Sequence, residues 1–216
     1  MNFKQTIFSI RGLTCQIMVN DGNENSNYSN FFKFWNGTLT LNYSMYLIFN
    51  INLDADGKVK KKGHVKSEDD IYESCTFSFF DMFKVKKVAK KLLEDLSGEY
   101  YTMEDHVERG LIPTVKPEFK KYLATLTNST KTNQIGFRPK FVYDRKNDEY
   151  LPVVLVIINR DDVGVRIPLD SFLSIMQYMV DLNLHDSAVA LINASLANKA
   201  LIKRNTTTTI NNTEVE

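Results

Sequence analysis

One stretch of the sequence decides the expected fold. Residues 137–182 read FRPKFVYDRKNDEYLPVVLVIINRDDVGVRIPLDSFLSIMQYMVDL. Residues 137–143 alternate apolar and basic side chains, the period of a half-buried strand, and residues 150–159 are almost all apolar, which predicts a central strand. A short strand is expected at residues 163–167, and Asp170 is expected to cap a helix that follows it. The stretch therefore predicts a basic strand, a buried strand, a short strand and a helix in succession.

A weaker version of the same order precedes it, in residues 37–96. Asn36-Gly37 predicts a hairpin turn, because both residues tolerate positive φ angles. Residues 38–44 and 46–53 alternate in hydrophobicity and predict two separate strands.

The end of this first stretch also predicts a strand followed by a helix. Residues 73–79 have strand composition, and Asp81 is expected to be the N-cap of a helix that ends near Leu96. The Asp54-Ala55-Asp56-Gly57 segment predicts a turn between strands; Lys58 stands where a further oxygen ligand for calcium would be needed.

Short matches connect the two stretches: Ile51-Asn52-x-Asp54-x-x-Gly57 with Ile158-Asn159-x-Asp161-x-x-Gly164, and Phe80-Asp81-x-Phe83 with Leu169-Asp170-x-Phe172. Short matches also arise by chance, so duplication and coincidence both stay open. The expected fold class is α+β, with two repeated antiparallel β-meander-plus-helix units and additional C-terminal helices.

The expected domain organisation follows from this pattern. Residues 1–204 form a single domain, or two fused repeats at about 1–98 and 117–182 followed by a helix at 187–204, and residues 205–216 form a disordered polar tail. Residues 3–19 predict two short strands or one bent strand.

The segment between the two expected repeats has weaker signals. Pro117 is expected to begin a short helix through Leu126, because proline suits the first position of a helix.

Charge is unevenly distributed along a chain whose net charge is only +1. Residues 58–91 contain ten lysines against five acids, and residues 116–146 contain eight basic residues against two acids. Such clusters can bind phosphate, although lysines also commonly cover solvated helix and hairpin surfaces.

The two cysteines, Cys15 and Cys75, favour neither a disulfide framework nor a metal site and are typical of a reduced compartment. No leader-like or membrane-spanning apolar run is evident, so a cytoplasmic protein without a membrane partner is expected, in the host cytoplasm if the chain is viral. The Asn-, Lys- and Ile-rich composition also fits an AT-rich genome, for example that of a phage.

Binding of single-stranded nucleic acid needs cations for the phosphates and aromatic faces for the bases. The candidate phosphate-binding residues are Lys58, Lys60, Lys61, Lys62, Arg138, Lys140, Arg145 and Lys146. The candidate stacking residues are Trp35, Tyr43, Tyr46, Tyr143 and Tyr150. The same aromatic residues are also typical of core or cross-strand packing.

The order of a strand meander closed by an Asp- or Asn-capped helix, repeated twice, resembles the Whirly family. It also resembles the transcriptional positive-cofactor-four family, in which single units pair as a dimer. The junction Ile167-Pro168-Leu169-Asp170-Ser171-Phe172 carries the resemblance, which covers roughly residues 37–182. The Lys-Gly-Lys-Ala-Ala-Leu motif of plant Whirly proteins is absent, and Lys61-Lys62-Gly63-His64 is the nearest segment. The resemblance implies curved sheets that bind single-stranded nucleic acid and helices that pack between subunits.

The expected function is therefore non-enzymatic binding of single-stranded DNA or RNA, with little sequence preference, in replication, recombination or transcription. A homo-oligomer formed through the helices is expected. No cofactor, metal site or catalytic residue is expected. A phage virion or assembly protein that does not bind nucleic acid is the alternative. An enzyme is disfavoured because no phosphate loop, nucleophile elbow or paired His ligands occur.

Overall fold

The structure is a computed structural model that describes residues 2–21, 32–36, 39–60, 64–97, 123–159, 164–194 and 196–197. The expected tail at 205–216 and the candidate residues Lys61 and Lys62 lie outside the described residues.

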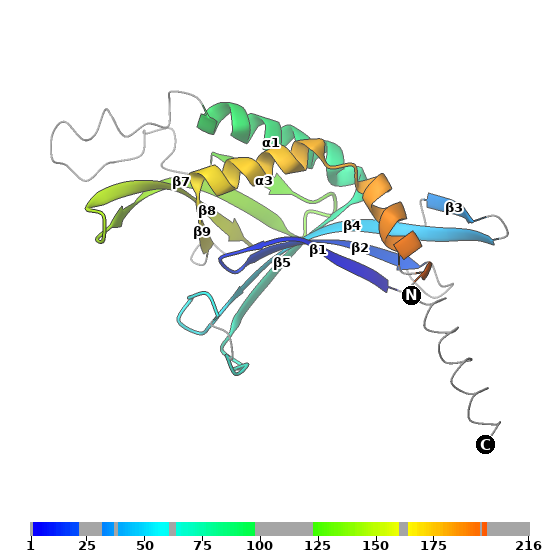
Figure 1. Ribbon diagram of the computed structural model, residues 1–216, viewed down its shortest axis with the longest axis horizontal. Helices are drawn as coiled ribbons and strands as arrows, with labels where there is room; N and C mark the ends of the chain where they lie inside the picture. The colour runs from blue at the N-terminus through cyan, green and yellow to red at the C-terminus, as the bar shows by residue number, and fades with distance from the viewer. Residues whose placement is uncertain are drawn as a thin grey trace, which may run out of the picture. The chain divides into compact units, whose positions relative to one another are not determined.

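The first sheet has five strands (Figure 1). They are β1 (Asn2–Ile10), β2 (Leu13–Asp21), β3 (Phe32–Asn36), β4 (Leu39–Leu53) and β5 (Ile71–Ser78). The order is β1-β2-β4, and both β3 and β5 pair with β4. The strands β1, β2, β4 and β5 thus form an antiparallel sheet in chain order, with β3 as an additional hairpin strand.

The long strand β4 corrects the prediction of two separate strands, at 38–44 and 46–53. Ser44 and Met45 lie at the expected break, yet they are only 3% and 4% exposed and continue the strand. The predicted β3–β4 hairpin is confirmed, but Asn36, predicted to lie in its turn, belongs to β3 and pairs with Leu39.

A hydrogen-bonded row of polar side chains crosses the first sheet. Asn50 is only 4% exposed, and its amide nitrogen donates to Gln16 Oε1 at 3.2 Å. Tyr72 donates its hydroxyl to Asn50 Oδ1 at 2.8 Å, and Gln16 donates to Thr6 Oγ1 at 3.1 Å. The row links β1, β2, β4 and β5 through side-chain hydrogen bonds and satisfies the buried amide of Asn50.

The first helical segment consists of a 3₁₀ turn, η1 (Phe79–Asp81), and α1 (Met82–Ser97). Asp81 was predicted to be the N-cap, but the N-cap is Ser78 and Asp81 is the third helical residue. Both residues form a capping box, in which the Asp81 carboxylate accepts from the backbone nitrogen of Ser78 at 2.9 Å. The prediction missed this because Ser-x-x-Asp and Asp at the N-cap are both favoured at helix starts.

The second sheet is a four-stranded antiparallel meander. Its strands are β6 (Ala124–Thr127), β7 (Gln134–Asp144), β8 (Glu149–Ile158) and β9 (Gly164–Pro168), and they follow one another in chain order. The helix α3 (Leu169–Asp181) comes directly after β9. Its N-cap is Pro168, which makes no side-chain cap, so the predicted N-cap Asp170 lies instead in the first helical turn.

Strand β6 corrects the end of the helix predicted to run from Pro117 to Leu126, while residues 117–122 of that prediction lie outside the described residues. Thr125 and Thr127 alternate with Leu126, which is 4% exposed, and Leu126 pairs with Ile135 of β7. Pairing with the edge of β7 outweighs the weak helical spacing of the apolar residues, because β-branched threonines favour strands.

The C-terminal helix starts earlier than predicted. Residues 184–194 are helical, whereas residues 183–186 were expected to be a break and the helix to begin at residue 187. Leu184, Ala188 and Ile192 are all buried, and their spacing of four residues gives the helix one apolar stripe.

Contacts divide the chain into two compact units. One comprises Thr6–Gln16 and Leu47–Leu182, and the other comprises Met1–Gln5, Ile17–Tyr46 and Asn183–Glu216. The first unit contains α1, α3 and the entire second sheet, and the functional site described below lies within it.

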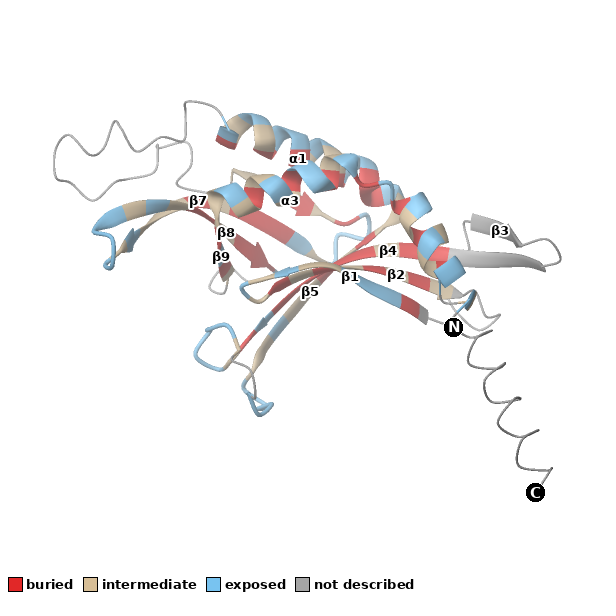
Figure 2. Ribbon diagram, viewed as in Figure 1, coloured by how far each residue is buried: buried red, intermediate tan, exposed pale blue. Residues whose placement is uncertain are grey.

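The two helices α1 and α3 pack against each other on one face of the second sheet (Figure 1). Phe172 of α3 meets Phe137 of β7 with ring centroids 5.6 Å apart. Buried residues line the sheet strands and the facing sides of both helices (Figure 2). Helix α1 contributes Met82, Val85, Ala89, Leu92 and Leu96 to this core.

The expected fold class is confirmed: the protein is α+β, with two antiparallel meanders that each lead into a helix. The two matched motifs occupy similar places. Ile51 lies near the end of β4 and Ile158 ends β8, each the third strand of its meander, and Asp81 and Asp170 lie at the strand-to-helix junctions. The equivalence ends at one position, because Phe83 is 78% exposed whereas Phe172 is buried.

No helix within the described ranges is long and apolar enough to cross a membrane.

Candidate functional site

Three cations lie on one face of the second sheet. In a strand, residues two apart share a face, and directly paired residues on neighbouring strands share it too. Arg138 of β7 pairs with Leu155 of β8, and Leu155 pairs with Arg166 of β9. Lys140 follows two residues after Arg138 and so lies on the same face. Helices α1 and α3 cover the opposite face, on which Phe137 is buried.

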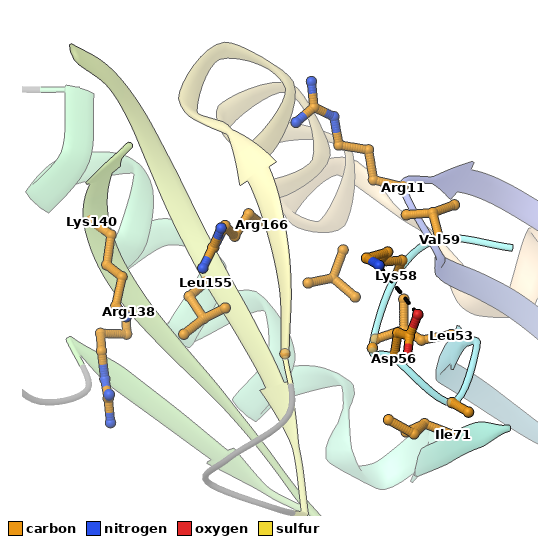
Figure 3. A pocket seen from close by; sticks show the side chains of 14 residues that line it. Arg11, Leu53, Asp56, Lys58, Val59, Ile71, Arg138, Lys140, Leu155 and Arg166 are labelled. Carbon is orange, nitrogen blue, oxygen red and sulfur yellow. Dashed lines mark hydrogen bonds and ion pairs between the residues drawn. The ribbon is translucent and has the colours of Figure 1, made fainter. Parts of the chain in front are cut away.

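These cations line a cleft with a volume of 690 Å³ (Figure 3). The opposite side of the cleft comes from the β1–β2 turn and from the loop after β4. The charged lining residues are Arg11, Asp56, Lys58, Arg138, Lys140 and Arg166, and the apolar ones include Leu53, Val59, Ile71 and Leu155.

The β1–β2 turn places Arg11 at the cleft. Arg11 and Gly12 both adopt positive φ angles, of 46° and 86°, as a two-residue hairpin requires. Gly12 lies close to β4, because the nitrogen of Asn52 donates to its carbonyl oxygen at 2.9 Å. A side chain at Gly12 would clash with Leu53, so the close contact of turn and strand fixes the position of the neighbouring Arg11.

The loop after β4 places Lys58. As predicted, Asp54 to Gly57 form a turn: Gly57 has φ 72°, and its nitrogen donates to the Asp54 carbonyl at 2.9 Å. The Asp54 side chain accepts from the backbone nitrogen of Lys58 at 2.7 Å, and Leu53 pairs with Val59. The turn therefore folds back and presents the Lys58 side chain at the cleft.

The cleft is strongly cationic. Among the lining residues that the structure describes, five are Arg or Lys and Asp56 is the one acid. Asp56 meets the Lys58 ammonium at 3.2 Å, but both side chains are about three-quarters exposed, at 74% and 75%. Such an exposed ion pair contributes little and exchanges readily with another anion. The excess of Arg and Lys over acids among the described lining residues gives the cleft a positive potential that attracts phosphate groups.

Of the predicted phosphate-binding residues, the structure brings together Lys58, Arg138 and Lys140, and it places Lys60 elsewhere. The Lys60 ammonium contacts the Asp70 carboxylate at 2.8 Å, and His64 Nε2 contacts the same carboxylate at 2.9 Å. The ion pair with Lys60 is the main reason that the pKa of Asp70 falls to about 2, and burial opposes it. Lys60 therefore stabilises the loop.

Arg145 and Lys146 also lie apart from the cleft, in the turn between β7 and β8. Three acids flank them, namely Asp144, Asp148 and Glu149. Asp144 accepts from the backbone nitrogen of Lys146 at 3.0 Å, so its carboxylate is used within the turn. This hairpin tip has more acids than cations and does not extend the positive surface.

The predicted aromatic residues do not join the cations. Tyr143 and Tyr150 pair across β7 and β8 with ring centroids 5.0 Å apart, on the sheet face opposite to Arg138. The hydroxyl of Tyr143 donates to Asp148, which raises the pKa of that phenol. Trp35 lies in β3 opposite Thr40, and Tyr43 lies in β4; their side chains are outside the described part of the chain. Tyr46 is half-buried in β4.

Sequence reasoning missed two cleft residues, Arg11 and Arg166. Arg166 had a detectable signal, because it is the exposed position between the buried residues Val165 and Ile167 of a short strand. Arg11 had none beyond its place in a turn, since its approach to the cleft depends on tertiary packing.

Other chemistry has little support in the described ranges. No group of three or more His, Cys, Asp or Glu side chains there is placed to hold a metal ion. Cys15 and Cys75 are both free and fully buried, and burial raises the pKa of each thiol, that of Cys75 to about 12. Neither thiol is therefore a good candidate for a nucleophile.

Comparison of the chain with protein-family models, with curated proteins and with solved structures finds no match.

Proposed function

We propose that the protein is a non-enzymatic single-stranded nucleic-acid-binding protein whose cationic cleft holds the phosphate backbone. The observation that supports this most is the convergence of Arg11, Lys58, Arg138, Lys140 and Arg166, from separate elements, in one cleft whose described lining includes a single carboxylate.

The spacing of the cations suits a chain of anions better than one small anion. Arg138 and Arg166 are two strands apart, about 10 Å, and Lys140 is two residues from Arg138, about 7 Å along β7. Separate sites at such distances neutralise successive phosphates of an extended strand. A flexible single strand can follow cations that lie on several elements, as in other positively charged grooves for single strands.

Within the described residues, the cleft lining holds aliphatic side chains and no aromatic ring. The affinity is therefore expected to come mainly from phosphate contacts, with Leu53, Val59 and Leu155 offering apolar contact to sugars. Phosphate contacts release counterions, so the affinity should fall steeply with salt. Single-stranded DNA or RNA both fit this chemistry.

The wider proposal follows the resemblance to the Whirly and positive-cofactor-four families. It holds that the protein coats single strands in replication, recombination or transcription, in the cytoplasm of a host if it comes from a phage. Association into a homo-oligomer through the helices is part of the same proposal.

The direct test is fluorescence anisotropy with a labelled oligo-dT and a matched duplex, at two salt concentrations. Tight, salt-sensitive binding of the single strand and weaker binding of the duplex are expected. Arg138→Ala combined with Lys140→Ala should weaken binding and lower the slope of log K against log salt by about 1.4, because each lost contact accounts for about 0.7.

A matched control is Arg145→Ala combined with Lys146→Ala, which removes the same charge from the β7–β8 turn outside the cleft. This control should bind nearly as well as the wild type. Equal losses in both double variants would contradict the cleft assignment, and no binding of the single strand at low salt would contradict the function.

The alternative function, a phage virion or assembly protein without nucleic-acid binding, is favoured by one observation. Phe80 and Phe83, at η1 and the start of α1, are 56% and 78% exposed. Exposed aromatic residues close together on one segment are typical of protein interfaces. Loss of self-association in Phe83→Ser, together with absent oligonucleotide binding in the wild type, would support this alternative.

A further inference from the structure

A second, smaller pocket lies where β6 turns into β7 and where β8 ends. Its volume is 250 Å³, and the residues that line it are Thr127, Lys131, Thr132, Asn133, Gln134 and Asn159. All six side chains are polar, and Lys131 is the one charged residue among them.

Buried hydrogen bonds fix the turn that forms one wall. Asn128 is 7% exposed, and its Oδ1 accepts from the backbone nitrogens of Thr132 at 3.0 Å and Asn133 at 3.3 Å. Its Nδ2 donates to the carbonyl of Thr76 in β5 at 3.3 Å. The wall is thus anchored to the first sheet and needs no ligand to hold it in shape.

Asn159 fixes the other wall. It adopts the left-handed φ of 58°, and its Oδ1 accepts from the nitrogen of Gln134 at 3.1 Å. Its Nδ2 donates to the carbonyl of Ser74 at 3.1 Å. The oxygen and the nitrogen of the Asn159 side-chain amide are therefore both used within the protein.

Three other polar groups of the pocket are not used in this way. The side chains of Lys131, Asn133 and Gln134 make no hydrogen bond or ion pair within the described part of the chain. The pocket therefore combines rigid walls with two free carboxamides and one ammonium group, which together offer both donors and acceptors.

The pocket is related to the cationic cleft through β7. Gln134 precedes Arg138 by four residues, so both lie on the same face, about 13 Å apart along the strand. A strand of nucleic acid bound by Arg138 and Arg166 therefore has nucleotides within reach of Gln134.

We propose that this pocket recognises the edge of one nucleobase of the strand whose phosphates lie in the cleft; this inference rests on the proposed function. A carboxamide donates and accepts side by side, which matches the hydrogen-bonding edges of exposed bases. The described lining of the pocket offers no aromatic ring for stacking, and the pocket is smaller than the roughly 300–1,000 Å³ of sites for drug-sized ligands. Edge recognition gives the protein a base preference that stacking alone does not provide.

The test compares the affinities of oligo-dT, oligo-dC and oligo-dA of equal length at one salt concentration. For the wild type, the best and worst of the three should differ about five-fold or more, as a good bidentate contact gives. Gln134→Ala should narrow this range to about two-fold while the salt dependence stays unchanged, because no phosphate contact is lost. Asn133→Ala provides a second variant with the same expected direction.

The matched control is Gln177→Ala, which removes an exposed glutamine of α3 and should leave the range of affinities unchanged. A wild type that binds all three oligonucleotides equally, or a Gln134→Ala variant that keeps the full preference, would overturn the base pocket and leave the cleft standing. Failure of the wild type to bind any of the three would overturn the proposed function together with the pocket.

Discussion

The hydroxyl of Ser129 donates a hydrogen bond to the buried carboxylate of Asp81 and thereby joins the β6–β7 turn to η1. The same carboxylate accepts from the nitrogen and the hydroxyl of Ser78, each at 2.9 Å, and Lys84 lies 3.7 Å away. Burial opposes ionisation, but the hydrogen bonds from Ser129 and Ser78 outweigh it and lower the pKa of Asp81. The two meander-plus-helix units therefore share one capping carboxylate.

Replacing this carboxylate should destabilise the protein. Asp81→Ala removes the capping box and leaves the hydroxyl of Ser129 without its acceptor, so a loss of about 2 kcal/mol or more in the free energy of unfolding is expected. Urea denaturation followed by circular dichroism measures this loss. Asp170→Ala is the matched control in α3, where no side-chain cap exists, and should change stability by about 0.5 kcal/mol or less. Similar losses in both variants would contradict the role of Asp81.

Local patterns predicted most of the fold, and the errors lie where two local signals compete. The alternation of apolar and basic residues in β7 and the apolar run in β8 each favoured a strand over other secondary structure. At the start of α1, however, Ser78 and Asp81 are both good caps. In the structure the Asp81 carboxylate accepts from Ser78 and also from Ser129 of a distant turn, and the second contact has no signal in the local sequence. Likewise Leu126 fits either a helix or a strand until Ile135 is present as its partner.

The candidate site was predictable only in part for a related reason. Arg138 and Lys140 were found because alternation in one strand assigns them to one face. Their partner Arg166 comes from a strand too short for a strong pattern, and Arg11 comes from a turn. Lys60 was assigned wrongly to the same surface, because its charge is visible in the sequence but its pairing with Asp70 is not.

Acid should weaken the stabilisation that Asp70 provides. Because the folded pKa is lowered from 3.8 to about 2, the unfolded state binds more protons in that range, and the contribution of Asp70 is lost as the pH falls from about 4 to 2. The difference in urea midpoint between wild type and Asp70→Asn should therefore be constant above about pH 5 and shrink below pH 4. A difference that stays the same down to pH 2 would show that the ion pair with Lys60 does not control this carboxyl.

Two glycines with positive φ angles, Gly12 and Gly57, allow the energetic cost of a left-handed backbone to be separated from the cost of steric crowding. Gly57→Ala should cost about 1–2 kcal/mol from the left-handed backbone alone, since a Cβ there meets nothing within 4 Å. Gly12→Ala should cost more, because its Cβ would lie 2.9 Å from Leu53 Cδ2 and 3.1 Å from the carbonyl oxygen of Asn52. Thermal or urea unfolding of both variants gives the comparison. Equal costs would mean that the β1–β2 turn moves away from β4 without penalty.

Both cysteines should be unreactive in the folded protein. Cys15 and Cys75 are fully buried, and burial is the main cause of their raised pKa values, so thiolate is scarce at neutral pH. Titration with a disulfide reagent at pH 8 should show no fast-reacting thiol in the native state and two in urea. Rapid reaction of one thiol in the native protein would indicate that the sheet carrying it opens readily.

Arg166, which is absent from the predicted binding residues, should contribute to binding as much as Arg138. Each of Arg166→Ala and Arg138→Ala removes one phosphate contact beside Leu155, so each should lower the slope of log K against log salt by about 0.7. Lys60→Ala is the control: it removes one positive charge that already pairs with Asp70 outside the cleft, and the slope should stay unchanged. Anisotropy titrations with oligo-dT at several salt concentrations measure all three slopes. A change in slope for Lys60→Ala equal to that for Arg166→Ala would mean that total charge, and not the geometry of the cleft, determines binding.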